Sequence, residues 1–462
     1  MREILELIRH EPRARVFAIA LTQSSLGTGA GYIALVIIAL DRLDSPWAIS
    51  LVLLADLVPA MLLGPVFGAA ADRWSRRTCT VIADLLRAVA FLGIAFVPGI
   101  EATIAFAALA GIGTGLFGPA ALAGLPSLVE KHRLPAATSL YGAISDLGFF
   151  VGPALAGAVL LVGSAETLML ANGLTFVVSA LLLSGLRFGA APERKPSAPG
   201  TQPRTSLFAE AREGLLAAAQ IAGVRTILVA SGAALFFAGL LNVAELPFAT
   251  DDLGTTKTGY SMLAAILGLG FIGGSLAGAK GGALPELRSR YLLGLLLLGV
   301  GLIASGLAPT FPVALATFAL FGFGNGLVLV YERLLIQRVV PDRLAGRVFG
   351  VKDSLSAWAF GAAFVVAGAI IALVGARSLL LIAGAGGVVV WSFATLALRR
   401  AWMGEEAERR HLGHRPDAAL RGLAGQDGPD AIAGRHHWLA LLDDLDERGD
   451  DLRVELGAGV GH

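Results

Sequence analysis

The stretch Gly68-Ala69-Ala70-Ala71-Asp72-Arg73-Trp74-Ser75-Arg76-Arg77 decides the fold of this chain. An apolar run over 45–71, whose only charge outside this stretch is Asp56, leads into it, and a second apolar run over 79–98 follows it. A bilayer core roughly 30 Å thick needs about 20 apolar residues per helix, so each run is long enough to cross a membrane. The stretch is therefore a charged hairpin between two membrane helices, and its arginine cluster indicates the cytoplasmic side.

The composition agrees with a membrane protein that crosses the bilayer many times. The chain has 462 residues, of which 55% are hydrophobic and only 15% charged, and its mean hydropathy is +0.73. Soluble domains carry roughly 25% charged residues. The 59 glycines are typical of helices that pack closely in lipid. With Cys79 as the single cysteine, no disulfide can form within the chain.

Apolar runs recur along the chain, six before and six after a polar break. They cover 16–40, 47–71, 79–98, 103–128, 137–163, 167–186, 225–249, 259–279, 291–308, 312–337, 346–374 and 378–398. The sequence therefore predicts an all-α polytopic membrane protein with twelve transmembrane helices in two pseudo-symmetric six-helix bundles. The expected parts are a cytoplasmic N-terminal segment 1–15, a bundle 16–187, a cytoplasmic linker with a surface helix 188–224, a bundle 225–400 and a cytoplasmic, largely disordered tail 401–462.

Charges in the loops predict the orientation. Basic residues gather in alternate loops, namely Arg73, Arg76, Arg77, Lys131, Arg133, Arg187, Arg194, Lys195, Arg204, Lys280, Arg288, Arg290, Arg338, Arg343 and Arg347. Because cytoplasmic loops carry the excess of Lys and Arg, both termini and the central linker are expected inside, with the chain in the cell inner membrane. The first run, 16–40, is too long for a signal-peptide core and has no convincing cleavage site, so we expect it to stay as a membrane helix.

The two halves of the chain contain similar segments at corresponding positions. Arg133-Leu134 begins a helix rich in small residues, and Arg343-Leu344 begins a similar one 210 positions later. Two related six-helix halves fit a transporter built from repeats around a midplane cavity. A chance pairing of two helices rich in Gly and Ala is the alternative.

The opening stretch resembles the loop signature of the major facilitator superfamily, G-x-x-x-D-R-x-G-R-R. The matching residues are Gly68, Asp72, Arg73, Arg76 and Arg77, and Ser75 departs from the usual Gly. In the family the signature Asp faces the start of helix eleven and steadies the outward-facing state. The resemblance implies this role for Asp72, opposite the region of Gly346 and Arg347. The alternative is a solvated basic hairpin that fixes only the topology.

A second pattern lies on the fifth expected helix. Gly148, Gly152, Pro153 and Gly157 resemble the G-x-x-x-G-P-x-x-G-G motif of major facilitator exporters. Small residues at this spacing allow close helix contact, and a proline inside a helix removes one hydrogen bond and kinks it. Ordinary tight packing of a kinked helix is the alternative, and it overlaps with the functional interpretation because such packing lets two halves rock.

Other segments resemble the macrolide-efflux and siderophore-export branch of this superfamily. They are 83–88, 118–120, 322–326 and 346–350. Relatives in this branch often carry an acid in helix one after a Gly, whereas here Thr28 follows Gly27. Proton-coupled drug exporters commonly carry an Arg in helix four, and 102–128 contains none. Proton antiport is therefore implied by the resemblance and not by these residues.

Acids within expected membrane helices are the candidates for a functional role, because a charge in the bilayer is expensive. They are Asp56, Asp146, Glu245, Glu332 and Asp353. A carboxyl group in a low-dielectric cavity can carry a proton near neutral pH. Asp56, Glu245 and Glu332 are the candidates for coupling, with Asn242 and Asn325 as further cavity candidates. For each acid, a structural hydrogen bond or ion pair is the alternative, and the amides, with Asn172 and Gln23, more often join helices.

Asp84 and Arg87 stand one turn apart on the third expected helix. An acid paired with a base inside a membrane costs less than either residue alone. We expect this pair to brace the loop signature, and a role in coupling is the weaker alternative.

We found no nucleotide-binding loop, nucleophile elbow or metalloprotease motif, and the tail residues His411, His414, His436 and His437 lack the spacing of a metal site. We therefore expect neither an enzyme nor a cofactor, a metal or a nucleic-acid partner.

The expected function is export of amphipathic or hydrophobic small molecules, drug-like or siderophore-like, by alternating access. Protons, the lipid bilayer and a small-molecule substrate are the expected partners, and the chain is expected to act as a monomer. Two alternatives stay open: a membrane sensor or scaffold that uses the acidic tail, and an importer or lipid transporter of the same fold.

Overall fold

The computed structural model describes residues 2–186, 188, 215–216, 219–278 and 281–413. Residues 1–398 form one compact unit and residues 399–462 a second. Most of the surface helix expected within 188–224 and most of the expected tail lie outside the described residues.

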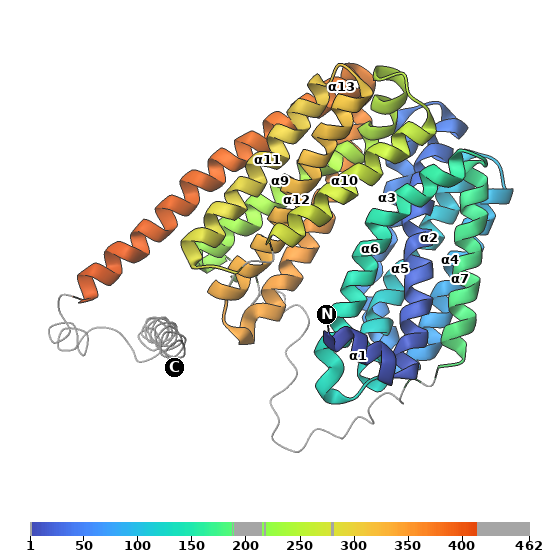
Figure 1. Cartoon of the computed structure of the whole chain (residues 1–462), viewed down its shortest axis with the longest axis horizontal. Coiled ribbons are helices and arrows are strands. Elements are labelled where there is room, and N and C mark those ends of the chain that lie inside the picture. Colours follow the sequence, from blue (N-terminus) through green and yellow to red (C-terminus); the bar gives the residue numbers. More distant parts are fainter. Residues whose placement is uncertain (1, 187, 189–214, 217–218, 279–280, 414–462) are drawn as a thin grey trace, which may run out of the picture. The chain divides into compact units, whose positions relative to one another are not determined.

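The described residues of the first half form seven α-helices (Figure 1). They are α1 (Arg2–His10), α2 (Pro12–Leu43), α3 (Pro46–Arg73), α4 (Arg76–Phe96), α5 (Ile100–Gly124), α6 (Leu134–Leu160) and α7 (Ala165–Ser184). Two short 3₁₀ turns, η1 (Leu125–Ser127) and η2 (Lys131–Arg133), join α5 to α6.

The second half is helical in the same way. It contains α9 (Ala222–Pro247), a π-helical turn η3 (Phe248–Asp252), α10 (Lys257–Gly278), α11 (Leu284–Leu307), α12 (Phe311–Val339) and α13 (Asp342–Gly413). In this half α12 packs against both α10 and α11 (Figure 1).

Eleven helices of the described residues are long and apolar enough to cross a membrane, and the last of them is too long for one crossing. Its apolar part, Leu344–Arg400, has 57 residues and would be about 86 Å long at 1.5 Å per residue. Gly375 interrupts it with a φ of 78° and a ψ of 165°, which a residue without a Cβ adopts at little cost. The sequence predicts a break between 374 and 378, so α13 would supply two of the twelve expected crossings.

Local signals set the two ends of the α3 helix. Asp44, with a φ of 51°, ends α2, and the Ser45 side chain caps α3 by accepting the Trp47 N–H at 3.3 Å. At the other end Ser75 caps α4 by accepting the Thr78 N–H at 3.0 Å. Ser75 stands where the loop signature has Gly, so this departure supplies an N-cap to the next helix. We call the end of the bundle at Trp74-Ser75 the signature end and the end at Asp44-Ser45 the far end.

Small residues let α6 lie directly on α2. A Cβ on Gly29 would be 2.1 Å from the Gly148 carbonyl oxygen, and a Cβ on Gly152 would be 2.5 Å from the Gly29 Cα. Neither position can accept a side chain without moving a backbone. The helix α6 continues through Pro153 to Leu160.

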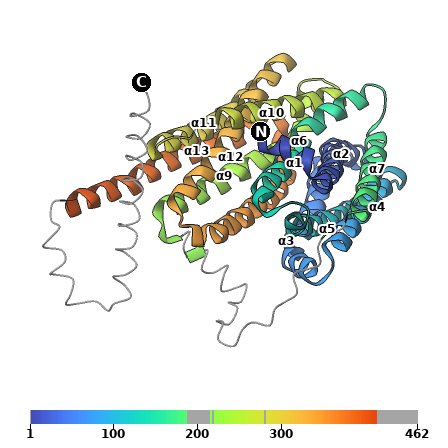
Figure 2. The same ribbon diagram turned by 60° about the horizontal axis from the view of Figure 1, so that its bottom comes forward.

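The remaining first-half helices pack around this pair. Helix α3 packs on α5, α4 packs on α5 and α7, and α2 packs on α7 (Figure 2). The halves contact each other where α13 packs on α3, since a Cβ on Gly368 would lie 2.5 Å from the Ser50 hydroxyl oxygen. They also contact each other through α6 and α10. There the rings of Phe150 and Phe271 stack with their centroids 4.1 Å apart.

Candidate functional site

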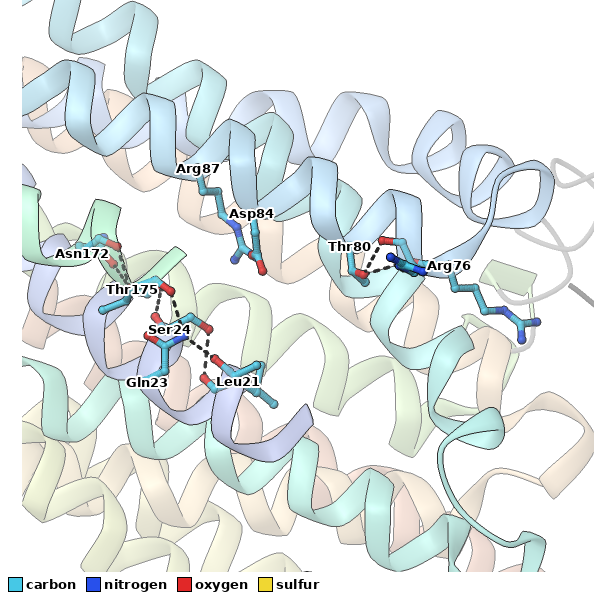
Figure 3. A network of polar contacts seen from close by, with 12 residues as sticks. Leu21, Gln23, Ser24, Arg76, Thr80, Asp84, Arg87, Asn172 and Thr175 are labelled. Carbon is cyan, nitrogen blue, oxygen red and sulfur yellow. Dashed lines mark hydrogen bonds and ion pairs between the residues drawn. The ribbon is translucent and has the colours of Figure 1, made fainter. Parts of the chain in front are cut away.

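The first half buries an ion pair between Asp84 and Arg87 on α4. The Arg87 guanidinium donates a hydrogen bond to Asp84, and the two residues are 7% and 0% exposed (Figure 3). The rings of Phe117 on α5 and Phe176 on α7 each lie 4.3 Å from the guanidinium carbon. The positive charge thus has a carboxylate partner and two aromatic faces, which favours a structural role.

Amide side chains near this pair join α2 to α7. Gln23 donates to the Thr175 carbonyl oxygen at 2.9 Å (Figure 3). Asn172 fits the surface of α2 so closely that a Cβ on Gly27 or Gly31 would lie 2.7 Å or 2.3 Å from its amide atoms. The Gln23 bond corresponds to the helix-joining alternative, whereas Asn172 packs against α2 and its Nδ2 has no hydrogen-bond partner among the described residues.

The signature loop is open in this structure. A Cβ on Gly68 would meet no described atom within 4 Å, and the same holds for Gly346 and Gly350 at the start of α13. Arg73 and Arg77 are exposed, and the Asp72 side chain lies outside what the structure describes. No described residue therefore packs closely on Gly68 in this arrangement.

The two halves meet at the far end and in the middle. Lys257 Nζ at the start of α10 lies 2.5 Å from Asp41 Oδ2 in the last turn of α2. Deeper in the bundle, Tyr32 on α2 donates its hydroxyl to Asn242 Oδ1 on α9 at 2.8 Å. Tyr32 and Asn242 are 210 positions apart, which is the offset that relates the two halves. The sequence could therefore have indicated that these two residues occupy corresponding positions.

A cavity of about 750 Å³ lies toward the signature end. Its lining comes from the α6 side, including Lys131, Thr138 and Asp146, and from Arg333 on α12. Asp146 and Arg333 are both exposed to this cavity. The halves are therefore joined at the far end and apart at the signature end.

Glu245 is the buried acid at the contact between the halves. It is 6% exposed on α9, and its Oε1 has no hydrogen-bond partner among the described residues. Tyr260 on α10 is fully buried and Tyr32 on α2 is half-buried. Both interact electrostatically with the Glu245 carboxyl group. Pro247 and η3 follow, and such interruptions of a helix are frequent at functional sites.

Asp56 interacts electrostatically both with the contact between the halves and with the first-half ion pair. It is half-buried on α3, and its charge acts on both Arg87 and Tyr32. The Asp56 backbone is pressed against α5, because a Cβ on Gly111 would lie 2.0 Å from the Asp56 carbonyl oxygen.

Glu332 lies inside the second half. It is 2% exposed on α12, and its Oε1 has no hydrogen-bond partner in the part of the chain that the structure describes. Ser231 on α9 faces its carboxyl group and shares a 2.8 Å hydrogen bond with the Tyr291 hydroxyl on α11. Asn325, on the same helix, is half-buried.

Asp353 belongs to the surface. Its side chain is 74% exposed and pairs with Lys352 at 3.3 Å, which is the ion-pair alternative. Sequence reasoning missed Tyr32, Tyr260, Ser231 and Tyr291 as neighbours of the candidate acids, since no motif marks them.

Comparison with known proteins gives a consistent answer. The model of the Major Facilitator Superfamily matches residues 16–352. The multidrug efflux pump Tap of Mycolicibacterium fortuitum is 28% identical over 375 residues, covering 77% of this chain and 88% of that protein. The putative bacilysin exporter BacE of Bacillus subtilis is 27% identical over 314 residues, covering 67% and 76%.

Solved structures share the fold at low sequence identity. A bacterial homologue of the human lysosomal transporter Spinster, in an inward-facing and unoccupied conformation, has a TM-score of 0.64 at 14% identity, covering 84% of this chain and 98% of that one. The nucleoside transporter NupG has a TM-score of 0.66 at 13% identity, covering 83% and 98%.

Proposed function

Because the chain belongs to the major facilitator superfamily and is a membrane transporter rather than an enzyme, we propose that it exports amphipathic or hydrophobic small molecules in exchange for protons. The relatives named as an efflux pump and an exporter support export as the direction. Transport would proceed by alternating access of a monomer in the cell inner membrane, with both termini in the cytoplasm. The arginines of the signature loop support this orientation.

In this orientation the described arrangement is open to the cytoplasm and closed to the outside. A substrate would approach from the cytoplasm or the inner leaflet through the cavity between α6 and Arg333 of α12. The contact of Tyr32 with Asn242 in the middle and that of Asp41 with Lys257 at the far end would then block the outer path.

Glu245 carries the proposal of proton coupling. An ionised carboxylate without a partner is expensive in a low-dielectric interior, so the buried group is expected to hold a proton. When the halves part at the far end, water reaches the contact between α9 and α2 and the proton can leave. Asp56 and Glu332 are the further candidates for the same path.

The test measures compound accumulation in cells with and without the protein, and with and without a protonophore. We expect lower accumulation of lipophilic compounds with the protein present, and loss of that difference with the protonophore. Accumulation that is the same in both cell lines for every compound of a broad panel would contradict export.

A substitution at Glu245 tests whether this residue carries the coupled proton. In vesicles with an imposed pH gradient, Glu245→Gln is expected to weaken the dependence of transport on the gradient, because the amide cannot release a proton. Glu101→Gln is the matched control, since that acid is exposed in the first turn of α5. Unchanged gradient dependence in Glu245→Gln removes the role assigned to this residue.

The signature acid has a separate test. We propose that Asp72 steadies the opposite, outward-facing state by approaching the start of α13 near Gly346. Asp72→Asn is expected to leave the folded protein in the membrane and to lower transport sharply. Flux equal to that of the unaltered protein in a matched reconstitution would refute this role.

A further inference from the structure

We propose that two pairs of opposite charges between the halves, Asp41 with Lys257 and Asp146 with Arg333, alternately hold the two end states of the bundle. They would be positioning residues, because neither pair needs to touch the substrate. The inference rests on the proposed alternating access and adds the contacts that stabilise each state.

The far-end pair is formed in this structure. The 2.5 Å contact joins α2 of the first half to α10 of the second, and the side chains of Lys257 and Asp41 are 48% and 44% exposed. The charge of Lys257 also acts on Glu166 at the start of α7, which is the other acid near this amine. Opening the far end would separate Lys257 from the first half and therefore break the pair.

The signature-end pair is set apart in this structure. Asp146 on α6 and Arg333 on α12 are both exposed and line the same cavity, and the charge of Arg333 acts on the Asp146 carboxylate. Both residues are described, and they form no ion pair here. Closing the cavity would bring these opposite charges together across the two halves.

The contact between α6 and α10 lies between the two charge pairs and would be the pivot about which the halves turn. Toward the far end, a Cβ on Gly157 would be 3.3 Å from the Ser261 Cβ, and Ser261 is bonded to the Lys257 carbonyl oxygen. In the middle, Phe150 stacks on Phe271. Asp146 precedes Phe150 by about one helical turn, which is about 6 Å along the axis toward the signature end. Asp146 lines the cavity.

Beyond that point α6 has no close neighbour on its open side. A Cβ on Gly142 would meet no described atom within 4 Å, in contrast to Gly157, which faces Ser261 of α10, and Gly142 lines the cavity. The two helices therefore diverge from Phe150 toward the signature end. A rocking motion about this contact would separate one charge pair while it brings the other together.

The experiment measures distances between spin labels in the full chain, without substrate or gradient. Cys79 is replaced by Ser, and labels are placed at Val162→Cys with Pro309→Cys for the far end, and at His132→Cys with Gln337→Cys for the signature end. Asp41→Lys is expected to lengthen the far-end distance and shorten the signature-end distance. The ratio of the two states is expected to shift roughly three- to tenfold, the range for a half-exposed ion pair turned into a repulsion.

The exchanged variant Asp41→Lys with Lys257→Asp is expected to restore both distances, because it rebuilds the pair with the charges reversed. Glu166→Gln is the control for the other acid near Lys257 and is expected to leave both distances unchanged. Unchanged distances in Asp41→Lys, or an exchange that restores nothing, would overturn the far-end assignment. If Asp41→Lys does not fold, Asp41→Asn and Lys257→Gln make the same test with a smaller shift.

The signature-end pair is tested in the Asp41→Lys background, in which the cavity is expected to be closed. Adding Arg333→Asp should reopen it, and Asp146→Arg with Arg333→Asp should close it again. A reopening that the exchange does not reverse would overturn this half of the proposal. Because no transport is measured, a protein with the expected distances that exports nothing would defeat the proposed function and leave these assignments intact.

Discussion

Each half of the chain buries an acid within its own helices, and the two surroundings differ. Asp84 in the first half is bonded to Arg87, which in turn lies between two aromatic rings. Glu332 in the second half faces Ser231, near Tyr291, and forms no ion pair with a described residue. A buried acid bonded to a base is fixed in one charge state, whereas Glu332, whose nearby cation Lys352 pairs with Asp353 instead, is free to exchange a proton.

The largest expected effect comes from removing the base of the first-half pair. Arg87→Gln would leave Asp84 buried without its cation, and such a loss costs about 3–5 kcal/mol of stability. The free energy of unfolding in detergent measures it. The double variant Asp84→Asn with Arg87→Gln should recover part of the loss, and a single variant as stable as the unaltered protein would show that the pair is not ionised.

The aromatic faces should matter next. Phe176→Leu removes one ring from the guanidinium of Arg87, and a desolvated cation–π contact is worth about 2 kcal/mol. Phe318→Leu in the second half is the control, because Phe318 is also buried and stacks on another ring, that of Phe248. We expect Phe176→Leu to lose more stability than Phe318→Leu, and equal losses would show that only packing counts.

A smaller loss is expected from the hydroxyl cluster of the second half. Tyr291→Phe keeps the ring and removes the 2.8 Å hydrogen bond to Ser231, for about 0.5–1.5 kcal/mol. Thermal unfolding in detergent measures it. A loss as large as that of Arg87→Gln would mean that the cluster carries a charge.

The smallest effect on stability is expected at Glu332 itself. If the buried carboxyl group holds a proton, Glu332→Gln replaces one neutral group by another of the same shape and should cost less than about 1 kcal/mol. Asp84→Asn, the matched change in the first half, removes an ionised partner and should cost more. Unfolding in detergent measures both losses of stability. The reverse order of the two losses would indicate that Glu332 is the ionised acid.

Much of the fold was predictable because the bilayer imposes a strong pattern on the sequence. The apolar runs coincide with the described helices to within several residues, and the break expected after residue 374 falls at Gly375. The loop signature and the glycine pattern of α6 pointed to the superfamily that the family match shows.

The site was less predictable for two physical reasons. Which residues meet across helices depends on the rotation of each helix about its axis, so Tyr32, Tyr260 and Ser231 carried no local signal. The second reason is that a transporter has more than one arrangement. No described residue packs closely on Gly68 or on Gly346 here, and the proposed role of Asp72 places its contact with the start of α13 in the other arrangement.

The hydrogen bond between Tyr32 and Asn242 has a geometric consequence. Two residues at corresponding places of a duplicated unit can touch only close to the two-fold axis that relates the copies. Points near a rotation axis travel least when one copy turns against the other, so this bond lies where the displacement is smallest. Substitution at either residue should therefore change how readily the copies turn more than it changes which arrangement they prefer.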